Sequence, residues 1–551
     1  MAVMEAGRMG DQARFNQSPP LADLDLFASD PPLAEAVKIN GLGDEARLLA
    51  AFGRRWGAGE MAEQARLANE NVPRLQAYDA SGFRRDTVEF HPAYHHLMKE
   101  SVGSSLHCST WTTDGERADA PAEVARAARV YMVAQVENGH LSSIITTRAA
   151  VAVLAAGGPP SAAEMIRKIV NRHYDPDFRP WSEKFGITVG MAVTERQAGT
   201  DVRGAATVAE PTADGYLVTG HKWFMSAPMS DAFVVLAQAP AGPTAVLVPR
   251  FRPDGEVNAL QLQRLKNKLG NRANASAEVE FRGAFGWRLG QEGAGVRTVM
   301  EMVQLTRFDC AVSSAGLMRA AFSRAVHHTR HRGVFGRHLS DQPMMRAVLA
   351  DLALEAEAAV ALAFRLARSF DRAAEEPGER MRARLLTPVA KYRITKATPA
   401  FVAEAMECLG GNGFIEDGVL PRLYREAPVN AIWEGSGNVV CLDVLRIVER
   451  DPEAVTAVVD DLLAEAGDLP GAHASAEAVR LALRSAEPGG GRAVVERLGS
   501  LAAAAALRAG ASPAAEPFAR SHLAGERGAT LGTSRLSSAE MDRLLARAMP
   551  G

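Results

Sequence analysis

The order of hydrophobic periods along the chain predicts an α+β fold in which helices and strands are segregated. Residues 30–180 carry helical spacing, short β-prone runs follow between residues 186 and 290, and helical spacing returns after residue 295. A regular alternation of strand and helix would instead indicate a doubly wound parallel sheet. The sequence therefore favours a helical unit, a β unit and a second helical unit, and it disfavours a Rossmann fold.

The length and composition fit several globular domains. Since a domain has about 150 residues on average, a chain of 551 residues has room for three or four domains. With 47% hydrophobic and 23% charged residues, the composition is that of an ordinary globular protein. We expect an N-terminal helical domain, a middle β domain, a helical bundle and a helical appendage, over residues 1–185, 186–290, 291–450 and 451–551.

Charge, hydropathy and cysteine usage exclude some classes of protein. The formal net charge is -3 and the pI is near 6.5, so no overall positive charge attracts the chain to nucleic acid or to an anionic membrane. No apolar run approaches the roughly 18 residues of a membrane span, and the first 20 residues hold no apolar h-region, so we expect no signal peptide. The four cysteines are far apart and are expected to be buried, reduced thiols. These features favour a cytoplasmic protein.

Several elements can be predicted individually. Residues 121–139 form an expected helix, because Pro suits a first helical turn and Gly suits the position after the last. Apolar residues from Met345 to Phe370 alternate spacings of four and three, which predicts a long helix with a partner. Residues 451–551 are rich in Ala and indicate a separate helical appendage. The expected strands cover residues 186–189, 216–219, 233–236, 245–248 and 278–281.

Three short segments have residues suited to a cofactor site. Residues 191–202 can direct N–H and hydroxyl donors at a ring or phosphate, although a strand followed by a polar turn has the same pattern. Residues 220–226 hold two large aromatics that can stack on a flavin or fill a core. Within residues 431–438, Glu434 lies between a bulky aromatic and two glycines. It can act as a base, or it can cap the helix expected near Asn438.

Together these segments resemble the acyl-CoA dehydrogenase superfamily. They read VTERQAGTD, WFMS and WEGSGN, and two further segments read RGVFG at residues 332–336 and LGGNGF at residues 409–414. The resemblance is closest to the AidB branch, flavoproteins of the bacterial adaptive response to DNA alkylation. The segments that carry this closer likeness are residues 15–17, 90–93, 268–276, 305–310 and 420–426.

The resemblance implies an FAD-binding flavoprotein with an N-terminal helical domain, a middle β-barrel-like domain and a C-terminal four-helix bundle. Residues of the first two segments would hold the flavin pyrimidine edge, the phosphates and the isoalloxazine ring. Residues around Glu434 would reach the cofactor from another part of the chain. The implied cofactor-binding residues in these segments are Met191, Val193, Thr194, Gly199, Thr200, Phe224, Met225, Ser226, Trp433, Ser436 and Asn438.

The resemblance also implies an oligomer. In the family, one set of positions touches the FAD of a neighbouring subunit, and we therefore expect a homotetramer made of two dimers. The matching residues here are Arg332, Phe335, Glu407, Gly410 and Gly411.

By the same resemblance, Glu434 aligns with the base that removes the α proton of an acyl-CoA thioester. A hydride leaves the β carbon for flavin N5 in that reaction. Some relatives carry the base at a position that aligns with Thr306, which cannot serve as a base. Glu434 is thus the single candidate. The implied substrate contacts are Thr194, Thr200, Ser226, Arg307 and Asn438.

Two departures from the family pattern indicate a reshaped acyl pocket. Trp433 replaces the usual Tyr, and Arg196 and Gln197 replace a common Pro–Gly pair. Three hypotheses stay open on this fold: an acyl-CoA dehydrogenase, a DNA-associated stress flavoprotein with little turnover, and a flavin-dependent monooxygenase or nitroalkane-oxidising relative.

Double-stranded DNA is a possible partner through the resemblance to the AidB branch. Residues 451–551 contain 10 Arg and no Lys against 13 Asp plus Glu, so this segment lacks the basic excess of a typical nucleic-acid binder. The histidines near residues 91–96 and 327–331 lie at helical spacing without nearby Cys or an HExxH glutamate, and we expect no metal site.

Overall fold

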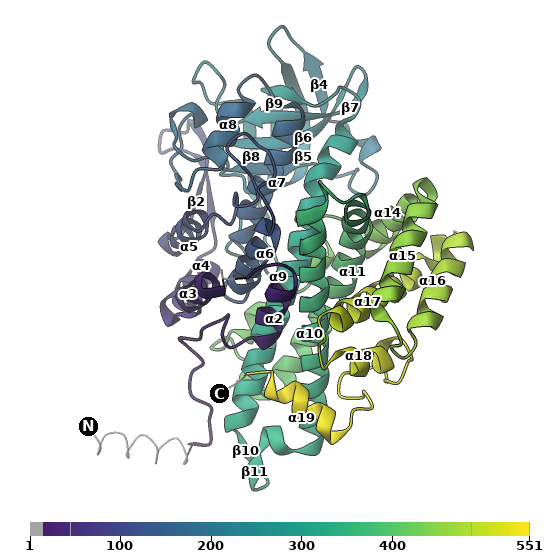
Figure 1. The fold of residues 1–551 in the computed structure, drawn as a ribbon. Helices are drawn as coiled ribbons and strands as arrows, with labels where there is room; N and C mark the ends of the chain where they lie inside the picture. The colour runs from purple at the N-terminus through teal and green to yellow at the C-terminus, as the bar shows by residue number, and fades with distance from the viewer. Residues whose placement is uncertain (1–14, 44–45, 486–487, 550–551) are drawn as a thin grey trace. The chain divides into compact units, whose positions relative to one another are not determined.

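The structure is a computed structural model that describes residues 15–43, 46–485 and 488–549. These residues divide into two compact units. The sheet unit comprises Glu60–Ala122 and Glu137–Asp309, and the helical unit comprises the other described residues. The colours of Figure 1 show that distant stretches of sequence contribute to the helical unit. The four domain ranges expected from the sequence remain predictions.

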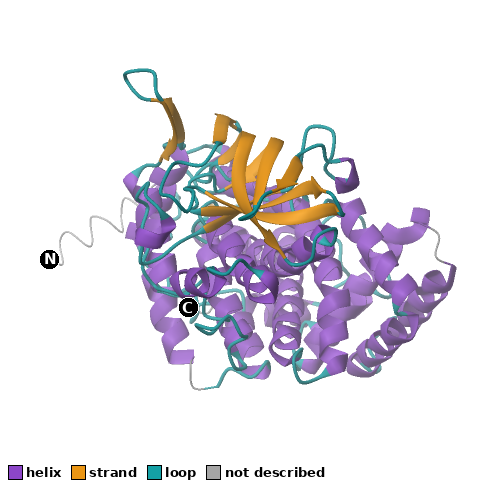
Figure 2. Cartoon of the chain, turned by 90° about the horizontal axis from the view of Figure 1, so that it is seen from above, coloured by secondary structure: helices purple, strands orange, loops and turns teal. Residues whose placement is uncertain are grey.

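A closed ring of strands forms the centre of the sheet unit. β5 (Tyr216–Ser226) pairs along its length with β9 (Ser276–Leu289), and β9 pairs with β7 (Gly242–Pro249). β7 pairs with β6 (Ala232–Ala239), and β4 (Val208–Pro211) pairs with both β6 and β5. Because these pairings return to their starting strand, the sheet closes into the expected barrel-like domain. Figure 2 shows the strands in orange.

Two further strands complete this sheet. β3 (Val189–Ala192) runs parallel to β6 and meets β5 at its end, while β8 (Leu260–Leu265) lies on the outer side of β9. Four of the five predicted β-runs lie within observed strands. The run at residues 186–189 is displaced, because Thr188 donates its N–H to the Asp231 carboxylate instead of to a neighbouring strand.

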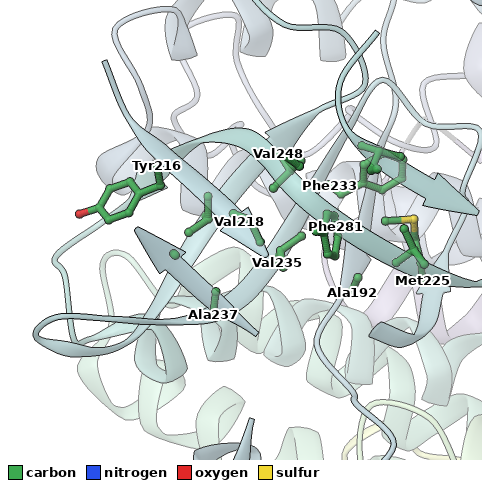
Figure 3. Packing of buried hydrophobic residues seen from close by; sticks show 14 of the residues in the cluster. Ala192, Tyr216, Val218, Met225, Phe233, Val235, Ala237, Val248 and Phe281 are labelled. Carbon is green, nitrogen blue, oxygen red and sulfur yellow. The ribbon is translucent and has the colours of Figure 1, made fainter. Parts of the chain in front are cut away.

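The barrel is filled by apolar side chains that point toward one another in Figure 3. β6 is buried without interruption from Ala232 to Ala237, which is typical of a strand covered on both faces. Phe233, Val235 and Phe281 are among its fully buried members. This rigid core fixes the strand ends that carry the flavin-binding candidates.

Helices and one hairpin complete the sheet unit. α7 (Leu141–Gly157) carries Arg148, whose guanidinium forms a wholly buried ion pair with Asp309 at 3.1 Å. Most of α4 belongs to this unit, as does α9 up to Asp309. The remaining elements are α4 (Gly59–Glu70), β1 (Arg74–Tyr78), β2 (Arg84–Glu89), α5 (Pro92–Gly103), α8 (Ala162–Ile169) and α9 (Gly295–His331).

The helical unit is built around α10 (Pro343–Arg372) and α11 (Pro377–Glu407), which pack against each other. α10 matches the long helix predicted from the apolar stripe, and its middle is buried. The helix predicted at residues 121–139 is shorter in the structure: α6 ends at Ala134. The other bounds are α2 (Pro31–Ile39), α3 (Ala46–Gly57), α6 (Ala122–Ala134), β10 (Gly333–Val334), β11 (Arg337–His338), α12 (Gly411–Phe414), α13 (Leu420–Glu426) and α14 (Gly437–Arg450).

The C-terminal segment is helical, as predicted, and packs directly on α10 and α11 instead of standing apart (Figure 1). α17 (Gly491–Ala509) contacts both helices, and its small residues allow this close approach. A Cβ added at Gly499 would lie 3.0 Å from the Cβ of Arg393 on α11. The remaining helices of the segment are α15 (Pro452–Ala466), α16 (Ala472–Ser485), α18 (Ala515–His522) and α19 (Ser538–Ala546).

Three buried carboxylates of α10 hold this C-terminal segment in place. Asp351, Glu355 and Glu357 are each less than 9% exposed, and each accepts hydrogen bonds from residues beyond 510. Such contacts are strong because at least one partner is charged. The donors are the backbone of Gly532, Thr533 and Ser534 to Asp351, His522 and Arg527 to Glu355, and Ser512 and Arg547 to Glu357.

Other expectations concern cysteines, metals and membranes. The four cysteines are buried and free, as expected. Among the described residues, no three His, Cys, Asp or Glu side chains gather in a group that could hold a metal ion. Within the same residues, no helix is long and apolar enough to cross a membrane.

Candidate active site

The flavin-binding candidates of the sheet unit come from two neighbouring chain segments. Met191, near the end of β3, lies opposite Ser226, the last residue of β5. The chain then leaves β3 into residues 193–200, here called the flavin loop. The backbone N–H of Trp223 donates to the carbonyl of Thr194 at 2.8 Å, and this bond joins the loop to β5. The fold thus brings together the first two predicted segments.

A fully buried ion pair strengthens this junction. The Lys222 ammonium of β5 donates to the Glu195 carboxylate at 2.5 Å and to the Val193 carbonyl at 3.2 Å, and neither charged side chain is exposed. Glu195 also accepts the backbone N–H groups of Ala206 and Thr207. Because each charge is paired inside the protein, the loop is fixed on the strand before any ligand binds.

The electrostatics of the pair follow from these contacts. Burial on its own raises the pKa of Glu195, but hydrogen bonds from Lys222, Thr207 and Ala206 outweigh it and lower the pKa to about 2. Burial lowers the pKa of Lys222, which Glu195 partly offsets. The carboxylate is therefore ionised at neutral pH and holds the loop through charge-assisted hydrogen bonds.

Side chains around the flavin loop differ in what they offer a ligand. Phe224 is 47% exposed between half-buried Trp223 and buried Met225, and the Lys266 ammonium lies 4.6 Å from its ring centroid, so the exposed part of the ring offers a surface for stacking. Met225 is fully buried in the barrel core (Figure 3), which leaves only its backbone for a cofactor. Gly199 lies next to Thr194, and both Gly199 and Thr200 are exposed.

The candidate base lies in the helical unit, on residues 432–437, here called the base loop. Glu434 is half-buried and has a φ of +59°, a conformation that a non-glycine residue rarely adopts. Lys391 of α11, which is 1% exposed, donates to the carbonyl of Gly435 at 2.7 Å. The indole N–H of Trp433 donates to Asn430, and Asn430 donates to Ser314. These bonds hold the strained loop in place.

The start of α14 bears on the helix-capping alternative for Glu434. The N-cap residue of this helix is Ser436, two positions beyond Glu434, so the proposed helix-capping position is not occupied by the glutamate. Ser436 and Asn438 are exposed at the first turn, where N–H groups lack intrahelical acceptors. Trp433, Glu434, Ser436 and Asn438 therefore lie on one short segment.

The residues expected at a neighbouring subunit's cofactor gather at another place in the helical unit. Phe335 lies at the tip of the β10–β11 hairpin with a φ of +51° and is 97% exposed. Arg332 donates to the backbone carbonyl of Asn16, and the Asn16 amide exchanges two hydrogen bonds with the backbone of Gly333. This hairpin is therefore fixed while its tip is free to contact a partner.

The second part of this group lies at the end of α11. Glu407 and Gly410 are exposed there, and Gly410 has a φ of +57° at the N-cap of α12, which begins at Gly411. The next residue, Asn412, donates to the side chain of Gln17 at 2.9 Å. The neighbouring residues Asn16 and Gln17 thus connect both parts of the group.

Two further predictions fall on α9. Arg307 is 3% exposed, and its role in substrate contact stays a prediction. Thr306 donates its hydroxyl to the backbone carbonyl of Val303, so it is engaged within the helix. The histidines that resemble metal ligands have local partners: His327 contacts the carbonyl of Pro19, and His95 contacts the hydroxyl of Tyr174.

Sequence reasoning assigned no role to Lys222, Glu195 or Lys391. A lysine inside an apolar run was the available signal, because a buried ammonium must find acceptors. Lys222 stands in a strand and Lys391 stands in the apolar stretch of α11. Which carbonyl each lysine reaches depends on tertiary contacts that spacing does not predict.

Three family descriptions match this chain in order. They are the adaptive response protein AidB N-terminal domain over residues 16–176, the acyl-CoA dehydrogenase middle domain over residues 190–284 and the acyl-CoA dehydrogenase C-terminal domain over residues 293–448. The chain is 49% identical over 453 residues to the putative acyl-CoA dehydrogenase AidB of Escherichia coli (strain K12), covering 82% of each chain. The protein therefore belongs to the acyl-CoA dehydrogenase family and, within it, to the AidB branch.

Solved structures agree with this assignment. The fold is similar to Caenorhabditis elegans ACDH-11 in complex with C11-CoA, with a TM-score of 0.81 and 26% identity, over 96% of this chain and 92% of that one. It is also similar to the apo-form of Bd2924, with a TM-score of 0.81 and 25% identity, over 90% of this chain and 99% of that one. The predicted fold class and family are confirmed.

The family is one of FAD-dependent oxidoreductases, so the predicted enzyme class and cofactor are confirmed. The residues present fit this cofactor. An exposed aromatic ring at Phe224 offers a stacking surface, and exposed Thr200 and Gly199 present a hydroxyl and an accessible backbone for polar groups. The individual cofactor contacts remain predictions.

Proposed function

We propose that the protein oxidises an acyl-CoA thioester, with Glu434 as the base that removes the α proton. The observation that carries this proposal is the left-handed backbone conformation of Glu434. Hydrogen bonds of Lys391 and Trp433 hold the loop in this conformation, which the start of helix α14 does not require. A strained non-glycine residue costs free energy of order 1–3 kcal/mol. Such strain is retained where it positions a functional group.

The roles of the other residues follow from their chemistry. The Glu434 carboxylate accepts the α proton, and the hydride that leaves the β carbon passes to FAD, which is the chemistry the cofactor supplies. When FAD is bound, Phe224 would stack on the flavin ring, and Thr194 and Thr200 would donate to its polar edge and phosphates. Met191, Val193, Ser226 and Gly199 line the same segment. Ser436 and Asn438 contribute hydroxyl and amide groups beside the base.

A similar solved structure with a bound ligand supports the proposed substrate class. The C. elegans ACDH-11 structure holds C11-CoA, and this chain covers 92% of it. We therefore include an acyl-CoA as substrate, with Arg307 as a proposed contact. Trp433 in place of the usual tyrosine supports a reshaped pocket. The four buried, free cysteines support a cytoplasmic location as part of the same proposal.

The decisive experiment is anaerobic titration of the FAD-bound protein with short, branched and long acyl-CoA thioesters. We expect one class to bleach the flavin absorbance and Glu434→Gln to abolish bleaching while FAD stays bound. Glu449→Gln, an exposed glutamate on α14, is the matched control and should bleach as the wild type does. Bleaching that persists in Glu434→Gln would refute the assigned base.

Self-association as a homotetramer is the second part of the proposal. Large apolar side chains are exposed around the residues assigned to the neighbouring subunit, which marks an interaction surface. Arg332, Glu407, Gly410 and Gly411 would then contact the partner's cofactor. The exposed side chains are Phe15 at 69%, Phe335 at 97%, Met344 at 85% and Phe414 at 79%.

DNA association with little dehydrogenase turnover is the alternative function, and it rests on the likeness to E. coli AidB. The charges of the C-terminal segment weigh against it, because several of its arginines are bound to carboxylates. Arg480 pairs with Asp460, and Arg508 pairs with Asp468. A flavin that stays oxidised with every thioester, together with salt-sensitive duplex binding, would favour this alternative. Oxygen consumption with a reduced flavin would favour a monooxygenase.

A further inference from the structure

A cavity in the helical unit lies away from every residue assigned to the flavin or the base. It has a volume of about 110 Å³ and is bounded by α2, α10, α15 and the end of α17. A cavity needs only about 10–15 Å³ by this kind of measure to hold one water. The cavity therefore has room for a small organic molecule.

The walls of this cavity are apolar on one side. Ile39 of α2 lines the cavity and is 41% exposed. Ala361 of α10 and Leu507 of α17 also line it. Gly510 closes the end of α17 beside Ile39, since a Cβ there would be 3.5 Å from the Ile39 Cδ1. A short hydrocarbon group would cover these surfaces and remove them from water.

One polar group in the lining needs a hydrogen-bond donor. Asn40 is 8% exposed, and its amide N–H donates to the carbonyl of Ala36 at 2.8 Å. Its carbonyl oxygen has no partner among the described residues. A buried acceptor without a donor costs about 1–3 kcal/mol. Since this oxygen has almost no accessible surface, the N–H or O–H group of a ligand would satisfy it after a turn of the Asn40 side chain toward the cavity.

One charge in the lining needs an anion. Arg365 binds Glu379 and Glu465, and Arg547 binds Glu35 and Glu357, so the acidic residues of the lining already have cations. Arg368 is a partly exposed lining residue of the same cavity, and among the described residues it forms no hydrogen bond or ion pair. Since Arg365 is already paired, a monoanion matches Arg368, whereas the carboxylates of Glu35, Glu357 and Glu465 would repel a dianionic phosphate more strongly.

We propose that this cavity binds a small amphipathic monocarboxylate. Its carboxylate pairs with Arg368, its N–H or O–H donates to Asn40, and its apolar part lies against Ile39 and Leu507. Because the cavity is formed by the N-terminal helix α2, bundle helix α10 and the C-terminal segment, a bound ligand connects all three. Binding to the folded state alone stabilises that state by mass action.

The test uses N-acetylglycine as the probe, because it carries a carboxylate, one N–H and little bulk. Two analogues separate the two polar contacts: N-acetylglycinamide lacks the charge, and N-acetylsarcosine lacks the N–H. Binding to the FAD-loaded full-length protein is measured by calorimetry and by the shift in melting temperature. We expect saturable binding of N-acetylglycine with one site per chain, and affinities about tenfold lower for both analogues.

Variants on α10 locate the site. Arg368→Gln should reduce the affinity for N-acetylglycine to that for the amide, and Ala361→Leu should block binding by filling the cavity. Arg372→Gln, one turn further along and paired with exposed Glu376, is the matched control and should bind normally. Absence of saturable N-acetylglycine binding, equal affinity for the acid and its amide, or unchanged binding in Arg368→Gln would overturn the proposal. Flavin bleaching by acyl-CoA provides an independent measure that the variants are folded.

Discussion

Two buried lysines carry the local order of the proposed active site. Lys222 holds the flavin loop through Val193 and Glu195, and Lys391 holds the base loop through the carbonyl of Gly435. In each case a lysine ammonium donates to a backbone carbonyl in a loop, where no helix or strand supplies a donor. The positions of the flavin loop and of Glu434 therefore depend on two lysine side chains that need not touch the substrate.

Replacing Lys391 by Met should slow flavin reduction by acyl-CoA about tenfold. A hydrogen bond from a charged donor contributes about 1.5–3 kcal/mol, and its loss frees the loop that carries Glu434. Anaerobic stopped-flow absorbance measures the rate, and FAD content should stay normal. Lys396→Met, an exposed lysine on the same helix, is the control. An unchanged rate in Lys391→Met would show that the loop holds its conformation without this contact.

Replacing Glu195 by Gln should destabilise the fold by about 3 kcal/mol at neutral pH, since Lys222 would remain buried without its counter-charge. The native pKa of Glu195, about 2, lies below its usual 4.5. Its contribution is thus complete above 4.5 and is lost as pH falls toward 2. Urea unfolding across this range should show a steeper acid loss for the wild type than for the variant. Exposed Glu280→Gln should keep the wild-type profile.

At the scale of elements, α10 joins the ends of the chain to the bundle. It packs on α11 and α17, and its buried carboxylates bind the C-terminal segment. Burial on its own raises the pKa of Glu355, but the charges of Arg393, His522 and Arg527 hold it well below the usual value. Glu355 is therefore ionised and clamps α18.

Replacing Glu355 by Gln should loosen the C-terminal segment. Breaking a buried ion pair costs about 3–5 kcal/mol, because its partners stay desolvated. Amide hydrogen exchange should rise in α18 and around Arg527, with little change in the barrel strands. Glu376→Gln, an exposed glutamate beyond the end of α10, should leave exchange unaltered. Uniform exchange in both variants would mean that apolar packing alone holds the segment.

The elements also show where sequence patterns succeed. Helix α10 was predicted because one buried face imposes a helical period on its apolar residues, and β6, β7 and β9 were predicted as short β-prone runs set between turns. The attachment of the C-terminal segment was missed, although α17 is buried from Leu501 to Leu507 on all sides. A helix that is apolar all round indicates a buried helix, but the pattern does not name its partners.

At the scale of the whole molecule, self-association decides whether the second group of cofactor contacts operates. Phe335→Ser should yield a smaller assembly with lower FAD content, because the exposed hairpin tip would no longer pack on a partner. Multi-angle light scattering gives the mass, and absorbance gives the FAD content. Phe83→Ser, 71% exposed in the sheet unit, is the control. An unchanged mass in Phe335→Ser would place the subunit contact elsewhere.

The sequence predicted the fold class and the family through short motifs, since those motifs are continuous in the chain, and the individual site residues remain predictions. It did not predict the link between Arg332 and Asn412. That link depends on Asn16 and Gln17, which lie more than 300 residues away. Arg332 donates to the backbone carbonyl of Asn16, and Asn412 donates to the side chain of Gln17. Contacts between distant, exposed polar residues leave no period in the sequence.

The junction between the flavin loop and β5 has a consequence for the kinetics of cofactor loading. Since Thr194 and Val193 are already bound to Trp223 and Lys222, FAD does not have to order this loop on arrival. A preorganised receptor avoids the entropy cost of ordering a segment during binding. FAD-stripped protein should therefore recapture the cofactor in a single fast phase, limited by encounter with the site.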